Sequence, residues 1–347
     1  MRVESMSLGK IVIYGAGSIG STIGGWMTPN HPDVHLIARK EHADVMKERG
    51  LTLSGQDESS ETVSVNVIDD LSEITDAKLL VLAVKNYDLK EAANDISSKL
   101  GDKVIVVALQ NGVENQLVLQ KFFSKVIYGV VGYSAMIVEP GVAKYQSRGP
   151  VYLGTIDNRS RLLLEEMGRI FNLGLEAEVT GRLQDTVHCK IVLNLTNALF
   201  TLIGLHYRKI SSYAKLAAIT SRLVNEGIDI VQAAGYKEYS MKNYPSWRTL
   251  RLGLKLPSFI RTAVLKRNVK HSILNSMGQD VLIKRKEKTE LEFLNGYIVN
   301  LANSVGVEAP LNKALYDLCK GEFSRTDFHP LSIEKVGDQL GPESIKE

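Results

Sequence analysis

The sequence has few cysteines, little net charge and no long apolar run, and each shortage excludes a class of protein. Its two cysteines, Cys189 and Cys319, lie 130 positions apart, which is typical of lone thiols in a reducing compartment and excludes a disulfide framework. Basic residues exceed acidic ones by only 42 − 39 = 3, so nothing favours a nucleic-acid partner. The longest apolar runs, such as Leu79–Val84 and Val104–Leu109, are far shorter than the roughly 20 residues of a membrane span.

What remains is the composition of an ordinary globular protein, with 44% apolar and 23% charged residues. A length of 347 residues suggests about two domains. The segment Met1–Gly9 lacks the apolar core of a signal peptide. We therefore expect a cytoplasmic protein with no membrane partner, no nucleic-acid partner and no metal site.

Short β-branched runs alternate with helix-length intervals in the first half, which predicts βαβ crossovers and a parallel sheet. The expected strands are Lys10–Tyr14, Val34–Ile37, Val63–Ile68, Leu79–Val84, Val104–Ala108 and Val126–Val130. From Val131 to Gly154 the pattern changes to short extended pieces separated by turn residues, which predicts a hairpin-like antiparallel edge.

Strand patterns stop after about residue 180, and long apolar segments that end at glycine predict buried helices. These segments are Gly181–Gly204, Ser212–Gly235 and Thr289–Gly306. We place the domain boundary after residue 179. The prediction is an α/β protein in which residues 1–179 form a parallel-sheet domain and residues 180–347 form an all-helical domain.

A glycine-rich loop directly follows the first predicted strand. Its residues are Gly15, Ala16, Gly17, Ser18, Ile19 and Gly20, a G-x-G-x-x-G pattern. In this context Gly15 permits a tight turn, Gly17 lets the backbone approach a pyrophosphate, and Gly20 allows close packing of helix on strand. The loop predicts that the first domain is of the Rossmann type and binds a dinucleotide.

The end of the second predicted strand indicates which dinucleotide is bound. NAD sites usually carry an acid there, whereas this chain has Arg39 and Lys40 and no acid before Glu41. A guanidinium can hold the 2′-phosphate as a planar fork. We expect NADP(H) as the cofactor, with Arg39 reading the phosphate, although a solvated surface pair is the alternative.

One apolar helix of the second domain carries a polar stripe. At about 100° per residue, Lys190, Asn194, Asn197 and Thr201 fall within about 60° of one another. Burying these groups without partners would cost several kcal/mol, so they meet water, one another or a ligand. Two interpretations stay open, an internal hydrogen-bonded network and a cleft in which Lys190 donates a proton.

Several motifs together make the chain resemble the ketopantoate reductase family, the NADPH-dependent 2-dehydropantoate 2-reductases. Besides the glycine loop and the Lys190 helix, they are the strand-end lysine of Leu82–Lys85, the Q-N-G loop within Ala108–Val113, and Ser276–Asp280 followed by Thr289-Glu290 and Asn295-Gly296. The motifs occur in the order of the family, from about residue 10 to about residue 320. The resemblance implies an active site in a cleft between the two domains.

The resemblance also implies roles for individual residues. The lysine matching Lys190 is the general acid, and the glutamate matching Glu290 supports the reacting oxygen. Residues matching Asn111, Asn194 and Ser276 hold substrate or cofactor, and Lys85 and Asn111 lie on the cofactor side. Asn197, on the same stripe as Asn194, is a further candidate for substrate binding. Ordinary helix capping is the alternative explanation for Ser276 and Glu290.

The chain departs from the family pattern at two places. The family commonly has a second asparagine eight residues after the lysine, where this chain has Ala198, with Asn197 one position earlier. The interval from Ser276 to Glu290 is about two residues longer than usual, and the extra length falls in Lys284–Lys288. It either shifts Glu290 or forms a loop.

A basic stretch from Pro245 to Glu290 has 11 Lys or Arg residues against three acids. A solvated helical pair is its simplest interpretation, and a surface for a larger anion is the alternative.

The function expected is the reduction of ketopantoate to pantoate by NADPH, in the synthesis of pantothenate and coenzyme A. Alternatives are the reduction of a different 2-oxo acid on the same scaffold and a non-catalytic NADP-binding sensor. The sequence also leaves a homodimer open. It does not show whether the segment after Phe323 is ordered.

Overall fold

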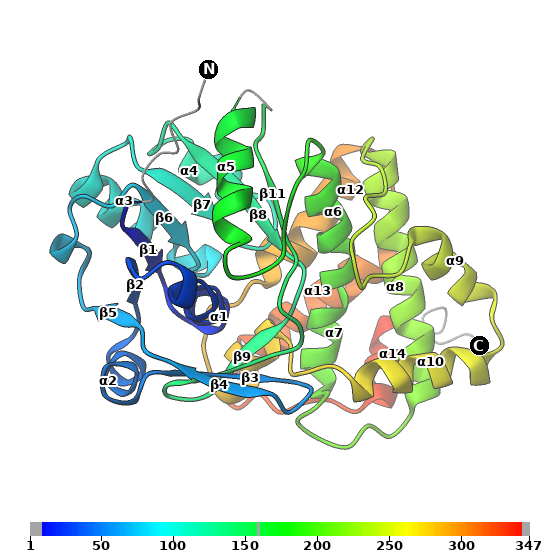
Figure 1. Cartoon of the computed structure of the whole chain (residues 1–347). Coiled ribbons are helices and arrows are strands. Elements are labelled where there is room, and N and C mark those ends of the chain that lie inside the picture. The colour runs from blue at the N-terminus through cyan, green and yellow to red at the C-terminus, as the bar shows by residue number, and fades with distance from the viewer. Residues whose placement is uncertain (1–8, 158–159, 342–347) are drawn as a thin grey trace. The chain divides into compact units, whose positions relative to one another are not determined.

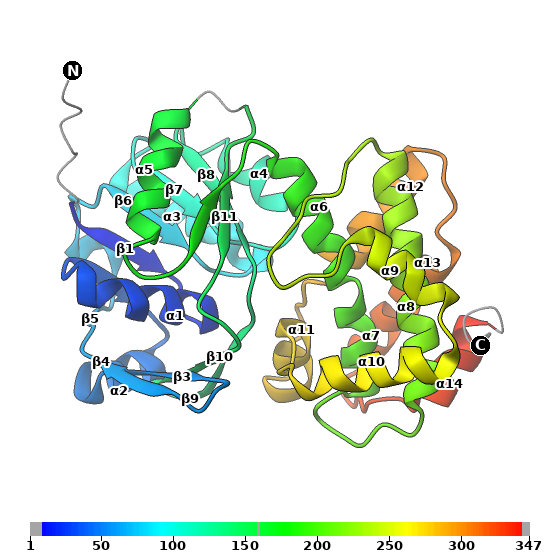
Figure 2. The same cartoon turned by 45° about the vertical axis from the view of Figure 1, so that its right-hand side comes forward.

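The computed structural model describes residues 9–157 and 160–341 and divides into two compact units between Leu183 and Gln184 (Figures 1 and 2). The division lies four positions beyond residue 179, where the sequence patterns change (183 − 179 = 4). We describe the N-terminal unit and the C-terminal unit each by itself.

The N-terminal unit is built on an eight-stranded sheet with the order β12-β11-β8-β7-β6-β1-β2-β5. Its strands are β1 (Ile11–Tyr14), β2 (Val34–Ile37), β5 (Asn66–Ile68), β6 (Leu79–Leu82), β7 (Ile105–Ala108), β8 (Val126–Val131), β11 (Val151–Gly154) and β12 (Ala177–Val179). The six strands from β5 to β8 in this order are parallel, and β11 is antiparallel to β8. This confirms the Rossmann-type sheet.

The chain leaves the central strand β1 first toward β2 and β5 and then crosses to β6 on the other side. The connections after β1 and after β6 therefore run in opposite directions. Such a switch point, at the carboxyl ends of parallel strands, is where ligands bind in open α/β sheets.

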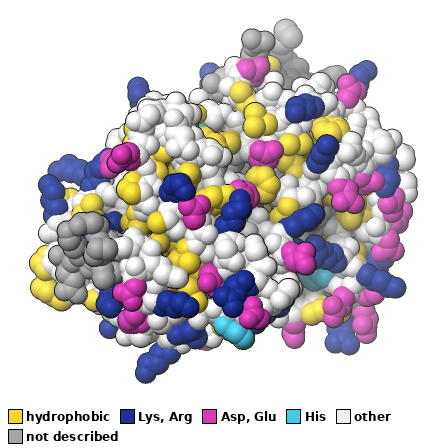
Figure 3. Space-filling model, turned by 180° about the vertical axis from the view of Figure 1, so that it is seen from behind, with side chains coloured by type: hydrophobic (Ala, Val, Ile, Leu, Met, Phe, Trp, Pro, Cys, Tyr) yellow, Lys and Arg dark blue, Asp and Glu magenta, His cyan; other side chains and the backbone are white. Residues whose placement is uncertain are grey.

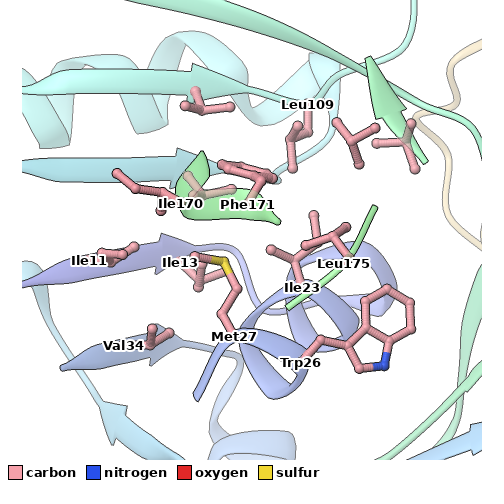
Figure 4. Packing of buried hydrophobic residues seen from close by; sticks show 14 of the residues in the cluster. Ile11, Ile13, Ile23, Trp26, Met27, Val34, Leu109, Ile170, Phe171 and Leu175 are labelled. Atoms are coloured by element: carbon pink, nitrogen blue, oxygen red, sulfur yellow. The ribbon is translucent and has the colours of Figure 1, made fainter. Parts of the chain in front are cut away.

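Helices complete the unit: α1 (Ser18–Met27), α2 (Lys40–Arg49), α3 (Leu89–Leu100), α4 (Glu114–Leu119) and α5 (Arg161–Phe171), with short turns η1 (Thr28–Asn30), η2 (Leu71–Glu73) and η3 (Asn86–Asp88). Helices α1 and α5 pack on one face of the sheet, and their residues Trp26, Met27 and Phe171 belong to the same buried cluster as Ile11 and Ile13 of β1 (Figure 4). Alternate strand residues are buried on the other face as well, which explains why these strands read as continuous apolar runs.

A second sheet has the order β4-β3-β10-β9, with β3 (Leu51–Gly55), β4 (Ser60–Val63), β9 (Ala135–Glu139) and β10 (Val142–Tyr145). The hairpin of β9 and β10 confirms the predicted antiparallel element. The expected single strand Val63–Ile68 is wrong, because β4 pairs with β3 and β5 pairs with β2 of the large sheet. Strand β3 was not predicted at all, although alternate residues such as Leu51 and Leu53 are buried.

The C-terminal unit is helical, as predicted. Its helices are α6 (Leu183–Asn194), α7 (Thr196–Ile203), α8 (Tyr213–Ala233), α9 (Trp247–Lys255), α10 (Ser258–Lys270), α11 (Ser276–Gly278), α12 (Tyr297–Ser304), α13 (Pro310–Phe323) and α14 (Ile333–Leu340), with two π-helical turns, η4 (Gln279–Ile283) and η5 (Glu292–Gly296). Of the segment after Phe323, the structure describes residues 324–341, which include helix α14. Its Ser332 cap and the hydrogen bond from Leu331 N to Leu202 O hold it to the unit.

The helix expected over Gly181–Gly204 is broken at Leu195 into α6 and α7. It ends, as expected, with Gly204 in the left-handed conformation, at a φ of 70°. By length and composition the segment Leu183–Ile203 could cross a membrane, yet 72% of its most apolar 18-residue stretch is buried inside the protein. We interpret it as a core helix.

Charged side chains of both signs are intermixed over the face of the molecule seen in Figure 3. This distribution agrees with the near balance of the whole sequence, +3 at pH 7.

Candidate active site

The glycine loop after β1 is held by the neighbouring strand. Both Gly15 N and Ala16 N donate to Ile37 O, the last residue of β2, at 3.2 and 2.7 Å. Gly15 has a φ of +94°, which a residue with a side chain rarely adopts. The first glycine is therefore required by the backbone of the turn.

The other two glycines have different physical reasons. A Cβ on Gly20 would lie 2.4 Å from Gly15 O, so the close approach of α1 to the loop requires glycine. A Cβ on Gly17 would meet no protein atom within 4 Å. Gly17 is the N-cap of α1, and the N–H groups of the first turn point out of this helix end. The open space beside Gly17 fits a phosphate group that approaches the helix N-terminus.

A buried hydrogen-bond chain supports the loop from behind. Ser21 Oγ donates to Ala16 O at 3.0 Å and lies 3.0 Å from His42 Nε2, while Gly141 N donates to His42 Nδ1 at 2.8 Å. Burial lowers the pKa of His42. The neutral imidazole thus links α1, α2 and the hairpin of β9 and β10. Sequence reasoning missed Ser21 and His42, because no local pattern marks them.

Arg39 is the N-cap of α2 and follows β2 directly. It is exposed and stands two residues after Ile37, the residue to which the glycine loop is bonded. An exposed guanidinium at this strand end is free to turn toward a ligand on the loop. This position suits the 2′-phosphate that the sequence predicted.

Lys85 and Asn111 follow the neighbouring strands β6 and β7, and two buried amides tie these strand ends together. Asn86 Nδ2 donates to Asn111 O at 2.7 Å, and Gln110 Nε2 donates to Leu82 O and Val84 O at 2.9 and 3.1 Å. The structure therefore brings Lys85 and Asn111 to one place. Neither Asn86 nor Gln110 was predicted to do this, although each is a polar residue within four positions of the end of a buried strand.

All predicted cofactor residues of the N-terminal unit thus lie at the carboxyl edge of four adjacent strands. The glycine loop follows β1, Arg39 follows β2, Lys85 follows β6 and Asn111 follows β7. This edge has a helix N-terminus, an open space over Gly17 and two cations. The residues present fit a dinucleotide.

In the C-terminal unit, Lys190 and Asn194 lie one turn apart near the end of α6. Lys190 Nζ donates to Tyr244 OH at 2.7 Å and lies 4.6 Å from the centre of that ring. Asn194 is almost fully buried, whereas Lys190 is half-buried. Lys190 is therefore the more exposed of the two residues.

Thr201, at the C-terminal end of the polar stripe, belongs to an internal hydrogen-bonded network. Thr201 is fully buried, and its Oγ1 donates to Asn275 Oδ1 at 3.3 Å. Asn275 Nδ2 donates to Asn197 O at 3.4 Å. For Thr201 the internal-network interpretation is therefore correct, while the side chain of Asn197 stays half-exposed.

Ser276 and Glu290 meet although 14 residues separate them, with Ser276 Oγ donating to Glu290 Oε2 at 3.4 Å. The capping interpretation is wrong for Ser276, which follows the cap residue Asn275. Asn275 caps α11 through Gly278 N, and Thr289 Oγ1 accepts from Leu291 N. Glu290 is nonetheless 2% exposed. A carboxylate so deeply buried needs hydrogen-bonding partners, and Ser276 is one of them, which makes the two residues a candidate functional pair.

The extra residues between Ser276 and Glu290 form a loop after the π-turn η4. Lys284 and Lys286 reach the buried Asp280 at 3.5 and 3.8 Å, and Arg285 Nη1 donates to Phe328 O at 3.0 Å. The extra length therefore forms a loop, and Ser276 contacts Glu290 across it.

Asn295 connects the Glu290 segment to the lysine helix. Its Nδ2 donates to Leu195 O at 3.1 Å, and the residue is fully buried. Leu195 is the break between α6 and α7, between Asn194 and Asn197. The N-G motif that contributed to the family resemblance thus fixes the position of one segment of the site on another.

The basic stretch forms helices α9 and α10. Arg251 pairs with Asp229 at 2.7 Å and also donates to Gln232 Oε1, while Lys266 lies over the ring of Tyr213. Several of its cations are therefore used within the unit, as the simpler interpretation expects.

A Rossmann-type sheet with a glycine loop, followed by a helical unit that offers an ammonium and a carboxyl, defines the class of NAD(P)-dependent oxidoreductases. Two family models match the chain, ketopantoate reductase PanE/ApbA over residues 11–158 and its C-terminal part over residues 182–322. The chain is 30% identical over 319 residues to the 2-dehydropantoate 2-reductase of Pyrococcus horikoshii, covering 91% of this chain and 98% of that protein. The chain belongs to the ketopantoate reductase family.

Solved structures show the same fold. The crystal structure of a PanE/ApbA family ketopantoate reductase from Ralstonia eutropha has a TM-score of 0.71 at 24% identity and covers 91% of this chain and 99% of that chain. The structure of D-mandelate dehydrogenase with NADH and anilino(oxo)acetate has a TM-score of 0.74 at 21% identity, covering 92% and 99%.

Proposed function

We propose that this protein is a cytoplasmic 2-dehydropantoate 2-reductase, which reduces ketopantoate to pantoate with NADPH for the synthesis of pantothenate and coenzyme A. The observation that carries the proposal is that the chain matches a relative of this activity over nearly its whole length and keeps the chemical groups that the reaction needs, Lys190 and the contacting pair Ser276 and Glu290.

The N-terminal unit would hold the cofactor. The first turn of α1, after Gly17, would bind the pyrophosphate, and Arg39 would bind the 2′-phosphate through charge-assisted hydrogen bonds. Lys85 and Asn111 would contact the nicotinamide side of the cofactor. When bound, NADPH supplies the hydride for the reaction.

The C-terminal unit would hold the 2-oxo acid and manage its charge. As the carbonyl carbon of the substrate is reduced, negative charge grows on the carbonyl oxygen, and Lys190 would donate a proton to it. The carboxylate of the substrate needs hydrogen-bond donors, which Asn194 and Asn197 supply without titrating. Ser276 and Glu290 would orient the reacting oxygen.

The alternative is that the substrate is a different 2-oxo acid, with another side chain than ketopantoate. The family commonly has an asparagine where this chain has Ala198, which is fully buried. Asn197 lies one position earlier with its carbonyl already bonded to Asn275. If these changes alter the pocket, the same machinery reduces another 2-oxo acid.

The test is NADPH oxidation, followed by absorbance, with ketopantoate, pyruvate, 2-oxoisovalerate and bulkier 2-oxo acids, and repeated with NADH. The proposal expects the highest kcat/KM for ketopantoate with NADPH. A higher value for another acid would support the alternative substrate. NADPH binding without turnover on any acid would leave the non-catalytic sensor. Gel filtration at several concentrations tests a homodimer.

A further inference from the structure

The loop between α8 and α9, residues 234–246, lies along the helix that carries Lys190. It brings Tyr244 to the lysine, whose Nζ donates to the phenol oxygen at 2.7 Å. The same ammonium lies 4.6 Å from the ring centre, within the range of a cation–π interaction. Tyr244 thus contacts Lys190 through both its hydroxyl and its ring.

Three residues of α6 hold the first part of this loop. Asp185 Oδ1 accepts from Lys237 N at 2.8 Å, and Cys189 Sγ accepts from Tyr239 N at 3.1 Å. Between them, the ring of His188 stacks on Tyr236 at 3.5 Å. Lys190 is the next residue of the same helix, so the loop and the lysine share one rigid support.

The second part of the loop fixes Tyr244 itself. Tyr244 N donates to Met241 O in a turn in which Asn243 has a φ of +67°, and Met241 is buried. Beyond the turn, Trp247 is buried and its N donates to Glu238 Oε1 at 2.7 Å. A loop anchored on both sides of Tyr244 holds its hydroxyl in a defined place.

We propose that Tyr244 is a positioning residue that places the ammonium of Lys190 for proton transfer; this inference rests on the function proposed above. A lysine side chain has many rotamers, and a flexible donor must lose that rotamer freedom at each turnover. The hydroxyl of Tyr244 takes one of the three N–H groups and leaves the others for the substrate oxygen. The ammonium is thereby held in place before the substrate binds.

The central test is Tyr244→Phe, which keeps the ring and removes the hydroxyl. We expect kcat to fall about 10-fold while KM for the 2-oxo acid changes less than about twofold, because only the proton-transfer step loses its orientation. The solvent deuterium isotope effect on kcat should rise, since proton transfer becomes more strongly rate-limiting. Tyr207→Phe, the same change at an exposed tyrosine, is the matched control and should behave as the wild type.

A second pair of variants separates the hydrogen bond from packing. Tyr244→Gln keeps an acceptor without the ring, whereas Tyr244→Leu keeps neither. We expect the glutamine variant to retain several times more kcat than the leucine variant at similar thermal stability. Equal kcat values in the two would overturn the inference.

The double variant Lys190→Ala with Tyr244→Phe distinguishes failure of the inference from failure of the function. If Tyr244 acts through Lys190, the double variant turns over no more slowly than Lys190→Ala alone. A further 10-fold loss, or a wild-type kcat in Tyr244→Phe while Lys190→Ala is inactive, would overturn the inference alone. An active Lys190→Ala would instead overturn the proposed proton donor.

Discussion

The two units present their candidate functional groups in different ways. In the N-terminal unit, backbone groups do most of the work, and Gly15, Gly17 and Gly20 lie within six consecutive residues. In the C-terminal unit, side chains from distant segments meet, as Ser276 does with Glu290 and Lys190 with Tyr244. A site made of backbone leaves a compact pattern in the sequence, whereas a site made of side chains depends on tertiary packing. Four predictions test this contrast, from the largest expected effect to the smallest.

Removing the ammonium should have the largest effect. Lys190→Ala is expected to lower kcat by about 10³-fold, within the range of a lost general acid, while NADPH affinity stays unchanged because the cofactor residues lie in the other unit. Steady-state kinetics and a fluorescence titration with NADPH measure the two quantities. Lys209→Ala, at an exposed lysine of the same unit, is the control. A simultaneous loss of NADPH binding would contradict the assignment of cofactor binding to the N-terminal unit alone.

The buried His188 should make the C-terminal unit sensitive to acid. Burial lowers the pKa of His188 to about 4, below its ordinary value of 6.5. A group with a lowered pKa on folding stabilises the folded state while neutral, so its contribution is complete above about pH 6.5 and is lost as the pH falls toward 4. The loss reaches about 3 kcal/mol at pH 4.

Native-state hydrogen exchange of the α6 amides at several pH values measures the free energy of opening. His188→Gln cannot titrate, so the stability gap between wild type and variant should narrow as the pH falls. A constant gap would show that protonation of His188 costs the fold nothing.

Substitutions of Gly17 and Gly20 should have different effects, one on cofactor binding and the other on stability. Gly20→Ala places a Cβ against Gly15 O and is expected to cost about 1–3 kcal/mol of stability. Gly17→Ala meets no protein atom, so its melting temperature should equal that of the wild type, while NADPH binding weakens at least about 10-fold. Thermal melting and NADPH titration of both variants measure the two effects. Normal NADPH affinity in Gly17→Ala would show that the pyrophosphate does not bind at this loop.

The cofactor preference should depend on one side chain. Arg39→Ala is expected to lower kcat/KM for NADPH by about 10-fold, as for the loss of a charged hydrogen bond of about 1.5 kcal/mol, and to leave that for NADH unchanged. Arg49→Ala, at the opposite end of α2, is the control. Equal losses with both cofactors would mean that Arg39 does not read the 2′-phosphate.

The contrast also explains how much could be predicted. The parallel strands, the glycine loop and the helical second half follow from local patterns that the structure confirms. Strand β3 was missed although it pairs locally with β4, and its second partner, β10, lies about 90 residues later in the chain. The contact of Leu195 O with Asn295, 100 residues away, likewise has no local pattern.

Residues that act as partners were the least predictable. Tyr244, Asn275 and His42 carry no motif of their own, and each matters only because folding places it beside another group. Helix periodicity put Thr201 on the same stripe as Lys190, but only the packing of α11 shows that it bonds to Asn275. A periodicity states which face a residue lies on and cannot state what covers that face.

The hydrogen-bond chain behind the glycine loop has one more consequence. Because Gly141 N donates to His42 Nδ1, the imidazole proton resides on Nε2 and points to Ser21 Oγ. The serine in turn donates to Ala16 O, inside the loop. A single imidazole N–H resonance in a proton NMR spectrum therefore reports on the loop from within the core, and its chemical shift would follow the loop as a ligand is titrated.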